Sequence, residues 1–188
     1  MDPSLSVVIC THNRCKLLKK CLESLATQQC EPWAFEIFVV DNASTDATRD
    51  VVDESSHVRS AIRCIFEGRL GISRARATGL RHARGRYIAY LDDDAVAQPG
   101  WCAAICQTFE QTAAGQQHKV AALGGPIEPV FETGRPPWLT AELEPLYAIL
   151  DLGNAIRVFP PGLHPVGANM AFRREILRDH PWDELCRR

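Results

Sequence analysis

The chain has 188 residues, 46% of them hydrophobic and 23% charged, and its formal net charge is −2. These values are ordinary for a globular protein with one sizeable core. The near-neutral charge favours no particular partner, and we expect no nucleic acid among the partners. No stretch approaches the roughly 20 apolar residues of a membrane span, and the N-terminus lacks a signal-peptide pattern, so any membrane contact would be peripheral.

Short apolar runs alternate with segments of helical spacing across residues 5–124. Strands are predicted at 5–10, 35–40, 60–66, 86–91 and 119–124. Helices are predicted at 14–27, after Ser44 or Thr45 as the N-cap residue with Asp46 in the first turn, and at 72–83 and 99–114. This alternation predicts an α/β fold with a Rossmann-like, mostly parallel, doubly wound sheet.

The composition of the sequence changes after Gly125, where prolines become frequent. Only a short helix near 140–150 and a strand near 166–172 are predicted in this part. We therefore divide the single domain, 1–188, into a ligand-binding half at 1–125 and a loop-rich half at 126–188. Loops carried on a rigid sheet commonly determine specificity for a substrate.

Eight cysteines are scattered along the chain without a Cys-x-x-Cys pair, which argues against a zinc ribbon or a redox motif. Cys102 and Cys106 lie four residues apart on a predicted helix, and the simplest interpretation is that they pack as free thiols. A reducing, cytoplasmic setting is expected.

Three adjacent carboxylates, Asp92, Asp93 and Asp94, follow the fourth predicted strand directly. Adjacent carboxylates repel one another unless a cation offsets their charge. In extended chain, Asp92 and Asp94 would share one face and Asp93 would take the other. The run therefore indicates a site for a divalent metal that holds a phosphorylated substrate, although a solvated turn or a helix cap is the alternative.

Polar residues also follow the first three predicted strands. The first is followed by Thr11-His12-Asn13-Arg14, the second by Asp41 to Asp46, and the third by Gly68, Arg69 and Gly71. In a parallel sheet, all of these segments lie at the carboxyl edge together with the acidic run. They should converge on one crevice.

Five segments resemble the family 2 glycosyltransferases of the GT-A fold, and they occur in the family's order along nearly the whole chain. They are Ser-Val-Val-Ile-Cys-Thr-His-Asn-Arg at 6–14, Val-Val-Asp-Asn-Ala-Ser-Thr-Asp at 39–46, Ala-Arg-Ala-Thr-Gly at 75–79, Ala-Arg-Gly-Arg-Tyr-Ile-Ala-Tyr-Leu-Asp-Asp-Asp at 83–94, and Pro-Val-Gly-Ala-Asn-Met-Ala-Phe-Arg-Arg-Glu at 165–175. The resemblance implies an inverting enzyme that transfers a sugar from a nucleotide-diphosphate donor, expected to be a UDP-sugar, to a hydroxyl acceptor in glycan or polysaccharide synthesis.

The resemblance also implies roles on the donor side. Thr11 and Asn13 match the motif that lines the nucleotide pocket, and Asp41 matches the acid that binds the base. Arg76 matches an arginine near the nucleotide. Asp94, with Asp92, matches the ligands of Mg²⁺ or Mn²⁺, and Asp92 or Asp93 matches the acid near the ribose. The alternative roles are a helix N-cap for Asp41 and a solvated helix face for Arg76.

On the acceptor side, the resemblance points to Gly167, Ala168 and Asn169, which are expected on a strand that borders the acceptor pocket. Tight packing explains these small residues equally well. Trp138, in a Pro-rich loop, could stack on a sugar ring or serve only a structural role.

An inverting transferase needs a general base, which members resembling this chain carry in a Glu-Asp motif downstream of the Gly-Ala-Asn segment. We expect that base beyond Arg188, because Asp183 and Glu184 match a turn upstream of it. The chain would then be a fragment or a truncated product, unless Glu132, Glu142 or Asp151 takes the role.

Three other functions are alternatives to a glycosyltransferase. A nucleotide-sugar-binding module without turnover remains the alternative to an enzyme. A nucleotidyltransferase would have a Gly-rich loop after the first strand, and Thr11-His12-Asn13-Arg14 contains no Gly. A phospho-acceptor receiver domain would need an acidic pair at the same place.

Overall fold

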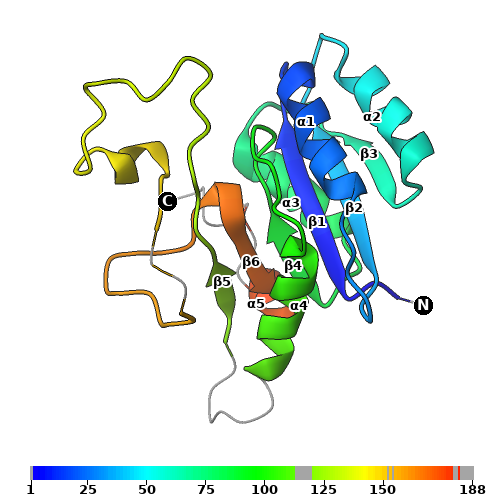
Figure 1. Cartoon of the computed structure of the whole chain (residues 1–188). Coiled ribbons are helices and arrows are strands. Elements are labelled where there is room, and N and C mark those ends of the chain that lie inside the picture. Colours follow the sequence, from blue (N-terminus) through cyan, green and yellow to red (C-terminus); the bar gives the residue numbers. More distant parts are fainter. Residues whose placement is uncertain (1, 113–119, 152, 154, 180–181, 183–188) are drawn as a thin grey trace.

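Residues 2–112, 120–151, 153, 155–179 and 182 are described by a computed structural model of the chain. Within these residues, six strands form one sheet in the order β3-β2-β1-β4-β6-β5 (Figure 1). The strands are β1 (Leu5–Thr11), β2 (Phe35–Asp41), β3 (Ile62–Phe66), β4 (Tyr87–Tyr90), β5 (Ala122–Gly124) and β6 (Met170–Arg173). The helices are α1 (Cys15–Ala26), α2 (Thr48–Val58), α3 (Ile72–His82), α4 (Trp101–Gln111) and α5 (Arg174–Asp179), with 3₁₀ turns η1 (Glu144–Tyr147) and η2 (Gly167–Asn169).

The first four strands are mutually parallel, as the sequence predicts. Strand β1 pairs with β2 on one side and with β4 on the other, while β2 also pairs with β3. Residues of β2 and β4 are buried throughout, because helices cover both faces of the sheet. The carboxyl ends of β1, β2 and β4 therefore come to one edge.

Alternate residues of β1 enter two different cores. Val7 and Ile9 pack with Leu22 of α1 and Phe109 of α4, whereas Val8 packs with Ala75 of α3. This alternation follows from the side-chain period of two along a strand. It places α1, α2 and α4 on one face and α3 and α5 on the other (Figure 1).

Helix α3 lies unusually close to the sheet at Gly79. A Cβ added there would collide with the side chain of Val8 and would lie 3.2 Å from Val40 Cγ2. Glycine is thus required by the close approach of helix and strand, which fixes the height of α3 above the sheet.

The second half extends the sheet with antiparallel pairs. Strand β6 runs antiparallel to both β4 and β5, and Gly124 is the register partner of Met170. Between those two residues, the chain makes a long excursion with little regular structure (Figure 1). None of the helices in the described part of the chain combines the length and apolar character that crossing a bilayer requires.

Two local expectations were wrong. The segment Gly167–Asn169 is a 3₁₀ turn rather than strand, because Asn169 N bonds back to the Val166 carbonyl at 2.9 Å. Helix α2 begins only at Thr48, with Ala47 at the N-cap position, so neither Ser44 nor Thr45 caps it and Asp46 precedes its first turn. The Asp46 carboxylate accepts the Thr48 N–H at 3.1 Å. The short helix expected near 140–150 is the 3₁₀ helix η1.

The described cysteines, which exclude Cys186, are free thiols. Cys102 and Cys106 are fully buried in the core on the α4 side of the sheet, as the packing interpretation predicts.

Candidate functional site

A cleft of about 480 Å³ opens at the carboxyl edge of β1, β2 and β4, in front of the N-terminus of α3. Its walls come from four separate segments of the chain. They are Cys10, Thr11, His12 and Arg14; Asn42; Leu70, Gly71, Ile72 and Ala75; and Asp92, Asp93 and Asp94. The strand-end segments therefore do meet in one crevice, as the parallel topology predicts.

The three aspartates lie in a turn, because β4 ends at Tyr90. Arg14 Nη1 lies 3.3 Å from Asp93 Oδ1 and 3.0 Å from Asp94 Oδ2. Asp92 instead faces Arg76, with 3.9 Å between Oδ1 and Nη2. Asp92 and Asp94 both line the cleft, but they face different arginines, and the extended conformation ends before the run begins.

Burial differs sharply along this acidic turn. The side chains of Asp92 and Asp94 are 42% and 48% exposed, whereas that of Asp93 is 7% exposed. Burial raises the pKa of Asp92 above its ordinary value, and Arg76 opposes this rise. Burial likewise raises the pKa of Asp93, against the effects of Thr11 and Arg14. Three carboxylates thus share two guanidinium groups, which leaves excess negative charge at the cleft.

Thr11 contributes a buried hydroxyl to the same wall. Its Oγ1 has no hydrogen-bond partner of good geometry among the described residues, so its influence on Asp93 is one of proximity. A buried hydroxyl without a partner is costly unless a ligand or water completes it. The hydroxyl is itself buried, so it belongs to the wall of the cleft beside Asp93.

Asn13 and Asp41 make contacts beside the cleft rather than within it. Asn13 has a positive φ of 54°, and its Oδ1 accepts the Thr45 N–H at 2.7 Å. Asp41 is buried and accepts the Ser44 N–H at 2.9 Å. Both side chains shape the segment between β2 and α2.

Arg76 lies behind Asp92 and against aromatic rings. Its guanidinium carbon is 5.8 Å from the Tyr90 ring centroid and 5.3 Å from that of Trp182. Tyr90 OH also accepts a 2.7 Å hydrogen bond from Trp182 Nε1. These contacts hold Arg76 in place, which a solvated helix face would not do.

Asn42 is a site residue to which the sequence interpretation gave no role. Its Nδ2 donates to the carbonyls of Glu67 and Arg69, at 2.9 Å each, and its Oδ1 accepts the Gly71 N–H at 2.8 Å. The loop that it holds presents the exposed apolar side chains of Leu70 and Ile72 to the cleft. An Asn directly after a strand-end Asp was the available signal.

The Gly-Ala-Asn turn lies between this cleft and a second cavity. A Cβ on Gly167 would lie 2.5 Å from Arg76 Nη2 and 3.4 Å from Asp92 Oδ1. Asn169 accepts the Trp101 Nε1–H at 2.9 Å and donates to the Pro126 carbonyl at 3.1 Å. Asn169 also lines a largely apolar cavity of about 880 Å³ between α4, β5 and the segment 153–165. Ala168 is the middle residue of the turn η2.

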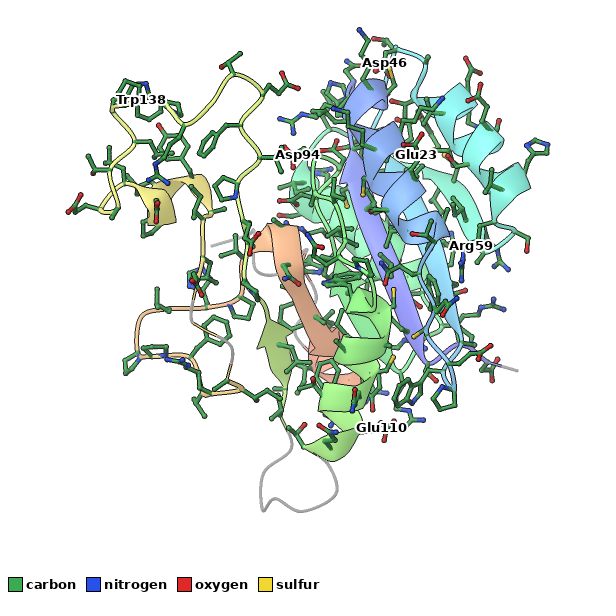
Figure 2. The ribbon with its side chains drawn as sticks, in the orientation of Figure 1. Glu23, Asp46, Arg59, Asp94, Glu110 and Trp138 are labelled. Carbon is green, nitrogen blue, oxygen red and sulfur yellow. The ribbon has the colours of Figure 1, made fainter. Side chains whose placement is uncertain are left out.

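Trp138 lies well apart from Asp94, as Figure 2 shows. It is 55% exposed, and its ring centroid is 5.7 Å from that of Tyr147. The structure therefore does not bring Trp138 to the acidic cleft.

The possible bases are likewise outside the cleft. Glu132, Glu142 and Asp151 are exposed, and none of them lines it. A hydrogen bond from Thr140 lowers the pKa of Glu142, which makes it a weaker base. Asp183 and Glu184 lie outside the described residues.

The donor set of the acidic turn fits a Mg²⁺ or Mn²⁺ ion that is completed by a ligand. No group of three or more His, Cys, Asp or Glu side chains is arranged as a metal cage within the described part of the chain. Mg²⁺ commonly binds through only one or two carboxylates together with substrate phosphates and water. Asp92 and Asp94 offer partly exposed carboxylate oxygens at the cleft, which is the kind of donor such ions take.

Comparisons with known proteins agree with this arrangement. The family model described as glycosyl transferase family 2 matches residues 6–180. Over 105 residues, the chain is 42% identical to validoxylamine A glucosyltransferase of Streptomyces hygroscopicus subsp. limoneus; the match covers 55% of this chain and 23% of that protein.

Two solved structures have the same fold over nearly the whole chain. A mannosyltransferase from Pyrobaculum calidifontis in complex with GDP-Man and Mn²⁺ is 24% identical, with a TM-score of 0.66 over 96% of this chain and 47% of that one. S. aureus TarS 1–349 in complex with UDP is 20% identical, with a TM-score of 0.71 over 96% of this chain and 51% of that one. The chain thus spans about half or less of the length of these proteins. The match over residues 6–180 and the shared architecture show that the chain belongs to glycosyl transferase family 2 and has the GT-A fold.

Proposed function

We propose that the protein acts as an inverting glycosyltransferase, which moves a sugar from a UDP-sugar to a hydroxyl acceptor in the synthesis of a glycan or polysaccharide. The observation that carries this proposal is the cleft in which Thr11, Arg14 and the acidic turn meet at the carboxyl edge of the sheet. Ligands of α/β proteins bind at this edge. A cytoplasmic setting, where any membrane contact is peripheral, belongs to the same proposal.

In this proposal the donor lies along the cleft. Thr11 lines the nucleotide pocket, Asp93 lies near the ribose, and Arg76 contributes positive charge near the nucleotide. Asn13 and Asp41 act on the base from the adjoining β2–α2 segment. Asp94 and Asp92 would hold Mg²⁺ or Mn²⁺.

When bound, such an ion supplies charge stabilisation for the departing nucleoside diphosphate. The chain's own arginines act on the same negative charge. Guanidinium groups form charge-assisted hydrogen bonds to phosphate oxygens. These hydrogen bonds strengthen as negative charge grows on the leaving group.

The choice of UDP is supported by the UDP complex of TarS, while the GDP-Man complex of the mannosyltransferase is the competing precedent. Calorimetry with UDP and with GDP, each with Mn²⁺, would decide between them. Tighter binding of GDP would overturn the UDP assignment and leave the transferase assignment intact.

The acceptor side of the proposal lies around Gly167, Ala168 and Asn169, whose turn separates the acidic cleft from the larger cavity. Trp138 would take part only at a more distant portion of the acceptor. Among the described residues, no carboxylate outside the acidic turn lines the cleft, so none of them is assigned as the general base.

A nucleotide-sugar-binding module without turnover is the second candidate. The observation that favours it is that the carboxylates lining the cleft, among the described residues, are those of the acidic turn itself. Transfer from UDP-sugars to a panel of hydroxyl acceptors, followed by product stereochemistry, tests the enzyme. Metal-dependent UDP binding without transfer or donor hydrolysis would favour the binding module for this chain.

A further inference from the structure

Arg14 pairs with the carboxylate that a divalent cation would use. Its Nη1 is 3.0 Å from Asp94 Oδ2 and 3.3 Å from Asp93 Oδ1. Within the described part of the chain, Arg14 is the one cation recorded in an ion pair with Asp94. A guanidinium and a divalent cation at the same carboxylate repel each other, so the two compete.

The geometry allows this arginine to leave without disturbing the fold. Its backbone is fixed at the start of α1, where the Arg14 carbonyl accepts the N–H groups of Leu17 and Leu18 at 3.0 Å each. The side chain, however, is 52% exposed. The side chain of Asp94 is 48% exposed, and exposed ion pairs of this kind contribute little stability. The guanidinium can therefore exchange Asp94 for another anionic partner, while the buried Asp93 stays beside it.

We propose that Arg14 is an exchangeable counter-ion of the donor site. It neutralises Asp94 and Asp93 while no donor is bound, and it transfers to the diphosphate of the donor when a divalent cation takes its place at Asp94. This inference rests on the proposed function, because it requires a diphosphate ligand in the cleft.

Charge explains the direction of the exchange. A divalent cation carries twice the charge of a guanidinium and attracts a carboxylate more strongly at equal distance. The released guanidinium then finds phosphate oxygens in the same cleft, which it can bind with two parallel N–H groups. Metal and nucleotide binding are thereby coupled, since each favours the position of Arg14 that the other needs.

This coupling predicts opposite effects of one substitution on two affinities. In Arg14→Gln, Mn²⁺ binding without nucleotide should tighten about 3- to 10-fold, because the competing cation is gone. Binding of UDP at saturating Mn²⁺ should weaken about 10-fold, because a phosphate contact is lost. A purely structural role would not tighten either affinity.

The experiment measures free Mn²⁺ by electron paramagnetic resonance and UDP binding by calorimetry. Arg49→Gln is the matched control, because Arg49 forms an exposed ion pair with Asp53 on α2, at 3.1 Å, away from the cleft. It makes the same change in net charge and should leave both affinities within twofold of the wild type. Thermal unfolding of each variant checks the fold.

Two results would overturn the role of Arg14. One is an Mn²⁺ affinity that is unchanged or weaker in a folded Arg14→Gln variant, while the wild type binds UDP with Mn²⁺. If Arg14→Gln does not fold, Arg14→Lys decides: it keeps the charge but loses the bidentate geometry, so UDP binding should weaken about threefold, and unchanged binding contradicts the proposal. Failure of the wild type to bind either UDP or GDP with Mn²⁺ would instead overturn the proposed function.

Discussion

Asn42 and Gly71, 29 residues apart in the chain, are joined by a hydrogen bond of 2.8 Å from the Gly71 N–H to Asn42 Oδ1. The same side chain donates to two carbonyls of the loop that precedes α3. One buried amide thus attaches the wall of the cleft that carries Leu70 and Ile72 to the end of β2.

Asn42→Asp should loosen that wall. The substitution keeps the acceptor for Gly71 but replaces two N–H donors with a carboxylate that faces two carbonyl groups. We expect UDP binding with Mn²⁺ to weaken about 10-fold and the free energy of unfolding to fall by about 1–3 kcal/mol. Calorimetry and urea unfolding measure the two effects, and an unchanged UDP affinity would remove Asn42 from the site.

Asp94→Ala should abolish metal-dependent binding of UDP while the fold stays intact, because the carboxylate is half exposed and belongs to a surface turn. Any transfer activity should fall on the order of 10²-fold or more, as charge stabilisation of this kind is lost. Asp53→Ala, on the exposed face of α2, is the control and should bind as the wild type does. Unchanged UDP affinity with Mn²⁺ in Asp94→Ala would contradict the metal assignment.

Gly167→Ala should perturb the donor site from the acceptor side. The added Cβ would lie 2.5 Å from Arg76 Nη2, which is the flexible end of a side chain and can therefore shift. The shift would separate Arg76 from Asp92, so we expect weaker UDP binding with a stability loss below about 1 kcal/mol. Gly68→Ala, where the added atom meets only Phe66 Cε1 at 3.3 Å, is a size-matched comparison. A large loss of stability without a change in UDP affinity would mean that Gly167 serves packing alone.

Gly79→Ala should destabilise the fold by about 1–3 kcal/mol, because the new methyl group collides with Val8 beneath α3. Combining it with Val8→Ala, which makes room, should give a smaller loss than the sum of the two single changes. Thermal or urea unfolding of the three variants measures this coupling. Strict additivity would show that α3 can move away from the sheet.

Glu67 should make the free energy of unfolding depend on pH in the acidic range. Hydrogen bonds from the Thr78 hydroxyl, at 2.6 Å, and from the Arg69 N–H, at 3.0 Å, lower the pKa of this carboxyl. A carboxyl whose pKa is lowered by folding contributes its full stabilisation above its unfolded-state pKa, which is ordinarily about 4.3 for Glu. This contribution is lost as the pH falls through the lower folded-state pKa.

Glu67→Gln should therefore lower the free energy of unfolding at pH 7 by about 1–2 kcal/mol, and the difference from the wild type should shrink between pH 5 and pH 3. The exposed Glu128→Gln provides the comparison and should show no such trend. A difference that stays constant over this range would mean that the charge of Glu67 contributes nothing.

The sheet was predictable because its strands are short apolar runs at regular intervals. When helical segments separate such runs, the pattern indicates a parallel sheet. The meeting of Thr11 with the acidic turn followed from the same parallel order. These conclusions required only that strand ends be located to within a residue or two.

What escaped prediction depended on where regular backbone stops. Asp92 and Asp94 follow Tyr90, where the strand ends and the chain turns, so the strand pattern could not predict that they pair with different arginines. The role of Asn42 was not predicted, because its partners are backbone groups of a loop distant in the sequence. No pattern of side chains in the sequence indicates such contacts. Ser44 and Thr45 do not cap α2, because the helix begins only at Thr48 and these two residues bond to Asn13 instead.

The pairing of Gly124 with Met170 has a consequence for how such a protein can vary. The excursion from Gly125 to Asn169 leaves the sheet from one strand and returns on its immediate neighbour, so its two ends stay together whatever lies between them. Lengthening a loop that is already closed costs little free energy. Insertions, deletions or wholesale exchange of this excursion could therefore change what the protein recognises, while the strands that present Thr11 and the aspartates keep their places.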